Sequence, residues 1–354
     1  MGLPLVREVK SAGEAAVRVL HAPAEIAGQA STLAKALRAL GVEAHSIAYN
    51  PGFPQYTPDE MRDYDARGVL PRYAGYLKTL AAHLGRYDVY HFHFGRTLVP
   101  PHNPDLPLYR ATGGRVVFHY HGCDIRNRAH MLKAHSHAAC TECDPFCSPA
   151  RQRAIGRAAA RYADAELVST PDLLESAPRA EHLPVAIDLA EYAPQPVRRT
   201  PKLVLHAPTN RLIKGTRYVE AAFEVLRPRF PDVEFRTVER MPWHALRALM
   251  AEADVMVDQV FMGWYGMVAI EAMALGRPAL CYIRPDFEPR LAADPIVRTT
   301  KETLAEDLSR VLSEADREDL GARGRAFVER ENAAPVIARR LIALYGRLLE
   351  PARA

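Results

Sequence analysis

The sequence DVMVDQVFMGWYGMVAIEAMALGRP occupies residues 254–278. Residues 255–257 are apolar and mostly β-branched, which predicts a short buried strand. Gly263 and Gly266 flank two aromatic residues, as expected for a turn, and residues 267–275 have the composition of a helix. The stretch therefore predicts a strand, a glycine-bearing turn and a helix in direct succession.

The start of this helix is a candidate anion site. A helix N-terminus offers unpaired N–H groups and the positive end of the helix dipole, so the amides of Gly266, Met267 and Val268 are expected to bind a diphosphate. Glu271 follows about a turn and a half later, where its carboxylate could accept hydrogen bonds from a ribose diol. The alternative is an ordinary strand-to-helix connection with a solvated glutamate.

Length and composition limit the class of protein. At 354 residues the chain exceeds the usual size of one hydrophobic core, which predicts two domains. It is 48% hydrophobic and 25% charged, as in ordinary globular proteins. The formal net charge is +4 and no long Lys/Arg block occurs, so nucleic acid is not an expected partner.

No apolar run reaches the roughly 18 residues that a membrane span requires. The N-terminus, MGLPLVREVKSAGEAA, lacks the apolar core of a signal peptide. The sequence therefore predicts a cytoplasmic protein without a transmembrane segment.

Expected strands and helices alternate in two series, which predicts an α/β fold with two doubly wound, Rossmann-like parallel sheets. The expected strands are residues 16–21, 44–48, 89–92, 116–120 and 167–169, then 202–206, 233–238 and 255–257. The expected helices are residues 28–40, 72–84 and 151–162, then 216–226, 243–253 and 267–275. The Pro- and Arg-rich segment 192–202 is the expected linker. The predicted domains are residues 1–195 and 196–333, followed by a C-terminal segment, 334–354.

The second half opens with HAPTNRLIKGT, residues 206–216, between its first strand and first helix. Ligands of such folds bind at the carboxyl ends of the parallel strands. Arg211 and Lys214 on this loop could neutralise a diphosphate, Arg through two parallel bonds and Lys as a point charge. A solvated basic loop is the alternative.

Three further stretches, together with the end of the first, make the chain similar to a known family. EIAGQASTLAKALRALGVEAHSI resembles an opening Gly loop and helix, RYDVYHFHF a strand that ends in His, VVFHYHGCDIR a catalytic-His loop, and GWYGMVAIEAMALGRP a donor-binding helix start. Together they resemble the retaining GT-B glycosyltransferases of the large group-1 family over nearly the whole chain. The resemblance implies two domains that face each other across a cleft, with the helix at residues 334–349 crossing back onto the first.

The resemblance also implies roles for individual residues. His121 would lie beside the anomeric carbon, Arg211 and Lys214 would bind the diphosphate, and Glu271 would bind the ribose. Catalysis in such enzymes rests on charge stabilisation and needs no metal cofactor. Three further residues are candidates near the acceptor or the reacting groups: Asp124 as a catalytic residue, and Gly28 and Arg126 on the acceptor side.

The chain departs from the family at Gly263, where its relatives have a glutamate that is usually assigned to the donor sugar. Three explanations remain open. Asp258 could reach the site instead, the protein could have lost transfer activity, or the donor sugar could need no such contact. In the last case, Trp264 and Tyr265 could form an aromatic rim for a sugar with an apolar face.

Three of the five cysteines, Cys140, Cys143 and Cys147, lie in HSHAACTECDPFC. Together with His137 they could form a closed structural zinc site, because Cys-x2-Cys spacing can place two thiolates on one tetrahedral ion. Buried thiols without metal and a single disulfide remain alternatives.

The expected function is transfer of a hexose-like sugar from a nucleoside diphosphate to a sugar or lipid-linked acceptor, in cell-surface polysaccharide or glycolipid synthesis. A sugar-nucleotide epimerase and a non-catalytic nucleotide-binding protein are the alternatives. Arg153, Arg157 and Arg161 recur on one helix face, which is either solvated or in peripheral contact with the inner face of the cell membrane.

Overall fold

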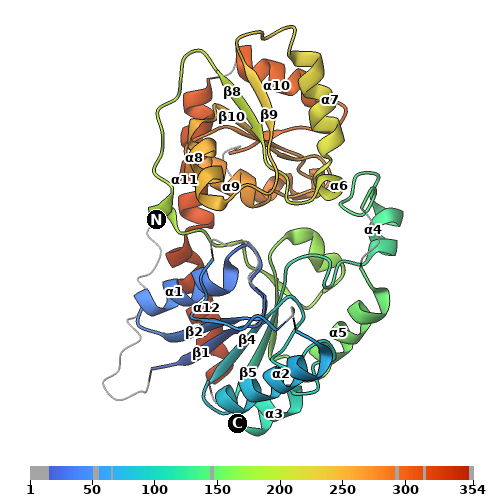
Figure 1. The fold of residues 1–354 in the computed structure, drawn as a ribbon, viewed down its shortest axis with the longest axis vertical. Helices are drawn as coiled ribbons and strands as arrows, with labels where there is room; N and C mark the ends of the chain where they lie inside the picture. The colour runs from blue at the N-terminus through green and yellow to red at the C-terminus, as the bar shows by residue number, and fades with distance from the viewer. Residues whose placement is uncertain are drawn as a thin grey trace.

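The structure is a computed structural model that describes residues 16–50, 56–64, 67–143, 147–291, 295–313 and 316–350. Two parallel sheets, each with helices on both faces, form the two halves of the molecule (Figure 1). This arrangement confirms the predicted α/β class. Residues 1–15, on which the signal-peptide prediction rests, lie outside the described residues.

The first sheet has seven strands in the order β3-β2-β1-β4-β5-β6-β7. Its strands are β1 Arg18–Ala22, β2 Glu43–Ala48, β3 Glu60–Met61, β4 Val89–His93, β5 Arg115–Tyr120, β6 Ala165–Val168 and β7 Glu181–His182. Its helices are α1 Gln29–Ala39, α2 Val69–His83, α3 Leu106–Ala111, α4 Arg128–Ala134 and α5 Pro149–Tyr162, with 3₁₀ turns η1 Pro171–Glu175 and η2 Leu189–Glu191.

The second sheet has five strands in the order β12-β11-β10-β8-β9. They are β8 Leu203–His206, β9 Glu234–Thr237, β10 Val255–Gln259, β11 Ala279–Cys281 and β12 Val297–Arg298. Its helices are α6 Arg211–Lys214, α7 Thr216–Leu226, α8 Trp243–Glu252, α9 Met267–Ala274, α10 Leu304–Ser313 and α11 Arg317–Glu331, with the 3₁₀ turn η3 Pro285–Arg290.

The second sheet has a hydrophobic core on each face, because successive apolar side chains of its strands point to opposite sides. Leu203 and Leu205 of β8 pack with α8, α9 and α11, whereas Val204 packs with α7 and α10. Successive side chains of a strand point to opposite faces, so a strand that is apolar throughout needs helices on both sides. The three apolar residues that begin β8 and the three that begin β10 thus account for the helices on both faces.

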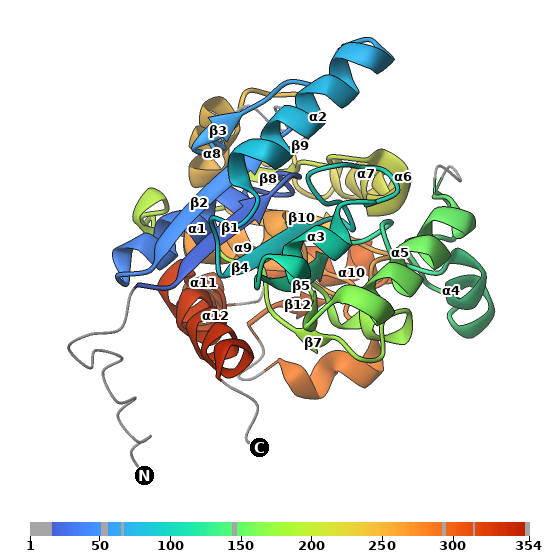
Figure 2. The ribbon, with the colours of Figure 1, turned by 90° about the horizontal axis from the view of Figure 1, so that it is seen from below.

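The last helix, α12 Ala334–Leu349, packs against α1 of the first half (Figure 2). Ile337, Leu341 and Tyr345 are fully or almost fully buried in a cluster with residues of α1 and of the first sheet. The Tyr345 hydroxyl also lies 2.7 Å from Nδ1 of His91 in β4. The C-terminal helix is therefore part of the core of the first half.

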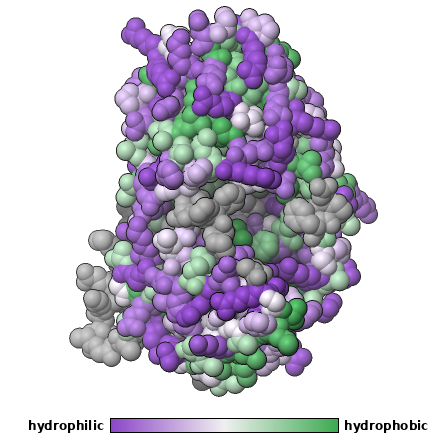
Figure 3. Space-filling model, in the orientation of Figure 1, coloured by the Kyte–Doolittle hydropathy of each residue, from purple (hydrophilic) through white to green (hydrophobic). Residues whose placement is uncertain are grey.

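The face shown in Figure 3 is mostly hydrophilic, with hydrophobic residues in small groups. Among the described residues, no helix combines the length and the apolar character that crossing a membrane would demand.

Substitution of Leu341 tests how much α12 contributes to stability. Leu341 has no exposed surface, so Leu341→Ala should leave a cavity and lower the free energy of unfolding by about 2–5 kcal/mol. Arg339→Ala, on the exposed side of the same helix, is the control and should change it by less than about 0.5 kcal/mol. Urea unfolding followed by circular dichroism measures both. Equal effects would show that α12 is not part of the cooperative core.

Candidate functional site

Five histidines form a column on one face of the first sheet, at the carboxyl ends of its central strands; four are buried and His121 is partly exposed. They are His21 of β1, His91 and His93 of β4, His119 of β5 and His121 directly after β5. Nδ1 of His93 lies 2.9 Å from Nε2 of His121, and Nε2 of His93 lies 3.0 Å from Nδ1 of His21. Burial lowers the pKa of His121 to about 3, so its imidazole is uncharged at neutral pH.

Three rings of this column could in principle hold a metal. The ligand nitrogens of His93, His119 and His121 lie within 4.8 Å of one another. Both nitrogens of His93, however, already face neighbouring histidine rings at hydrogen-bond distance. These contacts favour a hydrogen-bonded column of neutral imidazoles over a metal centre.

Asp124 fixes the loop that presents His121. Its carboxylate accepts hydrogen bonds from the backbone N–H groups of Gly122, at 2.7 Å, and His121, at 3.2 Å. Burial raises the pKa of Asp124 to about 6, although these N–H groups act in the opposite direction. Asp124 thus holds the backbone of the loop rather than the imidazole ring.

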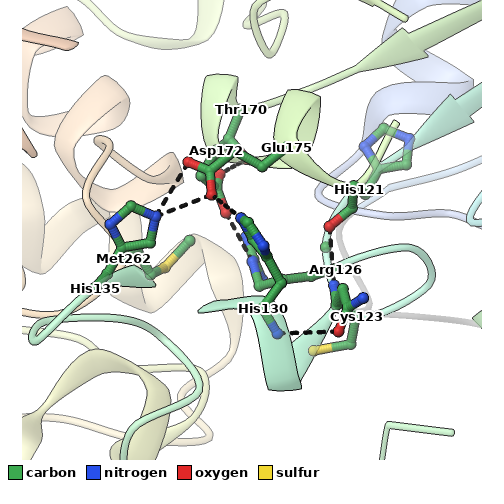
Figure 4. A network of polar contacts seen from close by, with 12 residues as sticks. His121, Cys123, Arg126, His130, His135, Thr170, Asp172, Glu175 and Met262 are labelled. Carbon is green, nitrogen blue, oxygen red and sulfur yellow. Dashed lines mark hydrogen bonds and ion pairs between the residues drawn. The ribbon is translucent and has the colours of Figure 1, made fainter. Parts of the chain in front are cut away.

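Arg126 lies in the same loop and pairs with a carboxylate in the interior. Its Nε donates to Asp172 of η1 at 2.7 Å, and both side chains are almost fully buried (Figure 4). The sequence suggested an acceptor-side role for Arg126, but the structure directs one edge of its guanidinium to Asp172.

The second half brings Lys214, Asp258 and Gly266 together. Lys214 Nζ lies 2.6 Å from Oδ1 of Asp258, and Oδ2 of Asp258 accepts the N–H of Gly266 at 2.6 Å. Both charged side chains are buried. A Cβ on Gly266 would lie 2.7 Å from Lys214 Nζ, so a side chain there would displace the ammonium group. Asp258 therefore occupies the start of α9, the predicted anion site.

Glu271, further along α9, is held by the linker segment. Its Oε1 accepts a hydrogen bond from the Tyr192 hydroxyl at 2.7 Å. Burial raises the pKa of Glu271 to about 7. Arg211, by contrast, lies at the surface and pairs with Glu220 and with Glu239, the latter at 2.7 Å.

The geometry of the turn before α9 favours glycine at position 263. Gly263 has a φ of 76°, and a Cβ there would lie 3.2 Å from Cβ of Arg284. Trp264 and Tyr265 are 3% and 4% exposed and pack in the core against Phe287 and Phe327, respectively. They do not form the aromatic rim that the sequence suggested, because the turn directs both rings inward.

A cavity of about 370 Å³ lies between the two halves, a size typical of small-molecule sites. Ala27 and Tyr56 of the first half line it, together with Tyr192, Trp243 and Met267. Gly28, next to Ala27, has a φ of 74°, and a Cβ there would lie 2.2 Å from the Tyr56 ring. The Gly28 loop and the start of α9 thus lie on opposite sides of one cavity.

The His121 loop also meets the second half directly. Cys123, two residues after His121, and Ile213, next to Lys214, line the same small pocket. Nearby, Arg284 forms an ion pair with Glu175 at 2.5 Å, and Glu175 also contacts His135 (Figure 4). The carboxyl ends of β5 and β8 therefore face each other.

All three cysteines that the sequence suggested as zinc ligands, Cys140, Cys143 and Cys147, line this pocket together with Cys123. His137 does not line it, and its Nε2 instead lies 3.1 Å from Glu302. Burial raises the pKa of Cys140 to about 12, although the guanidinium of Arg126 opposes the shift.

Several residues of the site were not identified from sequence. The contact between Tyr192 and Glu271 leaves no local signal, because 79 positions of chain separate the two residues. Trp243 follows the second strand of its sheet by a few residues, and this position at a strand's carboxyl end is the one signal that could have pointed to it.

No protein-family model matches the chain, and no curated protein matches it. Among solved structures it is similar to a sucrose-phosphate synthase from Thermosynechococcus elongatus, with a TM-score of 0.66 and 16% identity, over 94% of this chain and 99% of that one. It is also similar to a putative UDP-N-acetylglucosamine 2-epimerase from Listeria monocytogenes, with a TM-score of 0.59 and 13% identity, over 96% of this chain and 99% of that one. A third similar structure is a spinosyn rhamnosyltransferase complexed with thymidine diphosphate, with a TM-score of 0.51 and 15% identity, over 92% of this chain and 100% of that one. At these identities the likeness establishes the GT-B fold, which transferases and epimerases share.

The pKa of Glu271 predicts a pH-dependent stability. It rises from an ordinary value of 4.5 to about 7, so between these values the native state holds a proton that the unfolded state has lost. The free energy of unfolding should fall by up to about 3 kcal/mol as the pH rises through this window. Glu271→Gln cannot titrate at this position, so the fall across this window should be smaller in the variant than in the wild type by about that amount.

Urea unfolding of both proteins at intervals from pH 4.5 to 8 measures the difference, with Glu318→Gln on exposed α11 surface as the control. If Glu271→Gln kept the full slope of the wild type, Glu271 would not be the group that titrates.

Proposed function

We propose that the protein transfers a sugar from a nucleoside diphosphate to an acceptor, with retention of anomeric configuration. The observation that supports this most is the pocket shared by Cys123 and Ile213, because it sets the His121 loop opposite Lys214. A neutral imidazole and a buried cation on facing strand ends suit a reaction in which a diphosphate leaves a sugar.

The diphosphate would bind at Lys214 and at the first turn of α9. An ammonium group has three donors, so Lys214 can keep its bond to Asp258 and still donate to a phosphate oxygen. The N–H groups of Met267 and Val268 belong to the first turn, where no helical carbonyl can accept them. This site accounts for binding without Arg211, whose guanidinium is held by surface carboxylates.

The nucleoside would lie in the cavity between the halves. Glu271 is placed to bind the ribose after exchanging the Tyr192 hydroxyl for a sugar hydroxyl, since both are hydrogen-bond donors. Tyr192 and Trp243 line the cavity together with Met267, and their aromatic rings suit contact with a base.

At the sugar end, Nδ1 of His121 is the ring nitrogen left for the substrate, because Nε2 faces His93. In the proposed reaction the bond from the anomeric carbon to the diphosphate oxygen breaks. That oxygen takes the proton of the acceptor hydroxyl. The acceptor oxygen then forms a bond to the anomeric carbon on the face from which the diphosphate left. Lys214 and the α9 dipole stabilise the charge on the leaving group, and this step needs no metal ion.

The acceptor would enter beside the Gly28 loop, and we assign it to cell-surface polysaccharide or glycolipid synthesis in the cytoplasm. Arg153, Arg157 and Arg161 are all exposed on α5, as contact with an anionic membrane surface would require. A sugar-nucleotide epimerase is the second candidate, supported by the fold similarity to the Listeria protein.

The double substitution Lys214→Met with Asp258→Asn tests the donor site. Removing both charges avoids a buried unpaired carboxylate, which would itself destabilise by about 3–5 kcal/mol. The variant should keep the fold and lose about 100-fold or more in donor turnover, because the leaving group loses its cation. Lys78→Met, on the exposed surface of α2, is the control. Initial rates with UDP-, GDP-, ADP- and dTDP-sugars measure the effect.

Product analysis separates the candidates. Sugar transferred to an acceptor or to water with the donor's anomeric configuration supports the proposal. Isomerised sugar nucleotide formed without an acceptor would indicate the epimerase. Equal rates in the wild type, the double variant and His121→Ala would instead indicate a non-catalytic nucleotide-binding protein.

A further inference from the structure

Four of the five cysteines converge on one pocket. Cys123 follows β5, whereas Cys140, Cys143 and Cys147 lie between α4 and α5, and all four line the pocket together with Arg126, Ala139 and Ile213. The fifth, Cys281 in β11, is buried elsewhere, where Gln259 Nε2 donates to its sulfur at 3.1 Å. The convergence joins a loop of the candidate active site to a separate cysteine segment.

The pocket has the properties of a closed site. Its interior has no room for a water molecule, and all four cysteines have free thiols. Structural zinc sites are four-coordinate and closed, whereas catalytic ones keep a position for water. Four free thiols that line a pocket with no room for water therefore favour a structural ion.

Arg126 supplies charge of the required sign. It is 4% exposed, its Nε pairs with Asp172, and its Nη2 is buried without a hydrogen-bond partner in the described part of the chain. Four thiolates around one divalent zinc have a net charge of −2, and a buried negative charge is costly unless it is paired. The open edge of this guanidinium, in the wall of the pocket, can offset that charge.

We propose that Cys123, Cys140, Cys143 and Cys147 bind one zinc ion. Cys140 and Cys143 have the Cys-x2-Cys spacing of tetrahedral zinc sites. Cys123 takes the place that the sequence suggested for His137, whose ring is held by Glu302. Zinc does not require any redox chemistry of the thiols, which only lose their protons on binding.

The ion would tie together the two edges of the candidate active site. Met131, Ala138, Cys140 and Cys143 form a small apolar cluster against Ile213 of α6. Next to it, Glu142 pairs with Arg217 of α7 at 2.6 Å. No three of these sulfur atoms lie within 4.8 Å of one another among the described residues, so binding must draw the cysteine segment onto Cys123. Zinc would thereby set the distance between the His121 loop and the Lys214 loop.

Metal analysis of the full chain, washed with EDTA after purification, tests the proposal. Wild type should retain one zinc per chain, and Cys123→Ser and Cys143→Ser should each reduce retention about 10-fold or more. His137→Ala and Cys281→Ala are the matched controls and should keep the zinc. Wild type without zinc, or with iron and inorganic sulfide, would overturn the proposal. Loss in His137→Ala with retention in Cys123→Ser would also overturn it.

Cobalt substitution covers the case in which the cysteine variants do not fold. Wild type in which Co²⁺ replaces the zinc should show the intense thiolate-to-cobalt charge-transfer band and the d–d bands of a tetrahedral site. The weak spectrum of an octahedral ion would contradict the tetrathiolate site. Neither measurement depends on sugar transfer, so failure here leaves the proposed function untouched, and the reverse also holds.

Discussion

The buried pair of Lys214 and Asp258 organises the second half around one point. Lys214 is the last residue of α6, which follows β8, and Asp258 lies in β10; Asp258 also accepts the N–H of Gly266, the residue just before α9. Burying two charges is costly, and the cost is offset only when each finds good partners. Here the helix N-terminus provides the carboxylate with a second partner, so the strand ends and the helix must keep one fixed arrangement.

Lys214 and the start of α9 also determine which ligands this edge of the sheet can attract. A cation and a helix N-terminus at the carboxyl edge of a parallel sheet attract anions, and phosphates commonly bind there. The opposite edge presents neutral histidines, because burial prevents their protonation. The Cys123 and Ile213 pocket holds these edges face to face, and α12 packs the end of the chain into the first half. A buried cation thus marks the Lys214 edge, whereas the histidine rings of the opposite edge are neutral.

Sequence patterns predicted most of the central strands and the helix after Gly266, because apolar periodicity and glycine placement are local signals. They also singled out Lys214 and Glu271, whose roles stay predictions. What they did not predict depends on pairing between distant segments: Asp258 bound to Lys214, and Tyr192 on Glu271. For Trp264 and Tyr265 the local pattern suggested a role that the structure does not support. Aromatic residues in a turn suggest a binding surface, but the positive φ of Gly263 directs this turn so that both rings enter the core.

The central claim is that the Lys214 edge binds the diphosphate of a nucleotide sugar. A crystal structure of the protein with a bound nucleoside diphosphate tests this claim most directly. We predict a phosphate oxygen within hydrogen-bond distance of Lys214 Nζ and of the N–H groups of Met267 and Val268, with the ribose at Glu271. A nucleotide bound away from α9, with Lys214 contacting only Asp258, would contradict the account.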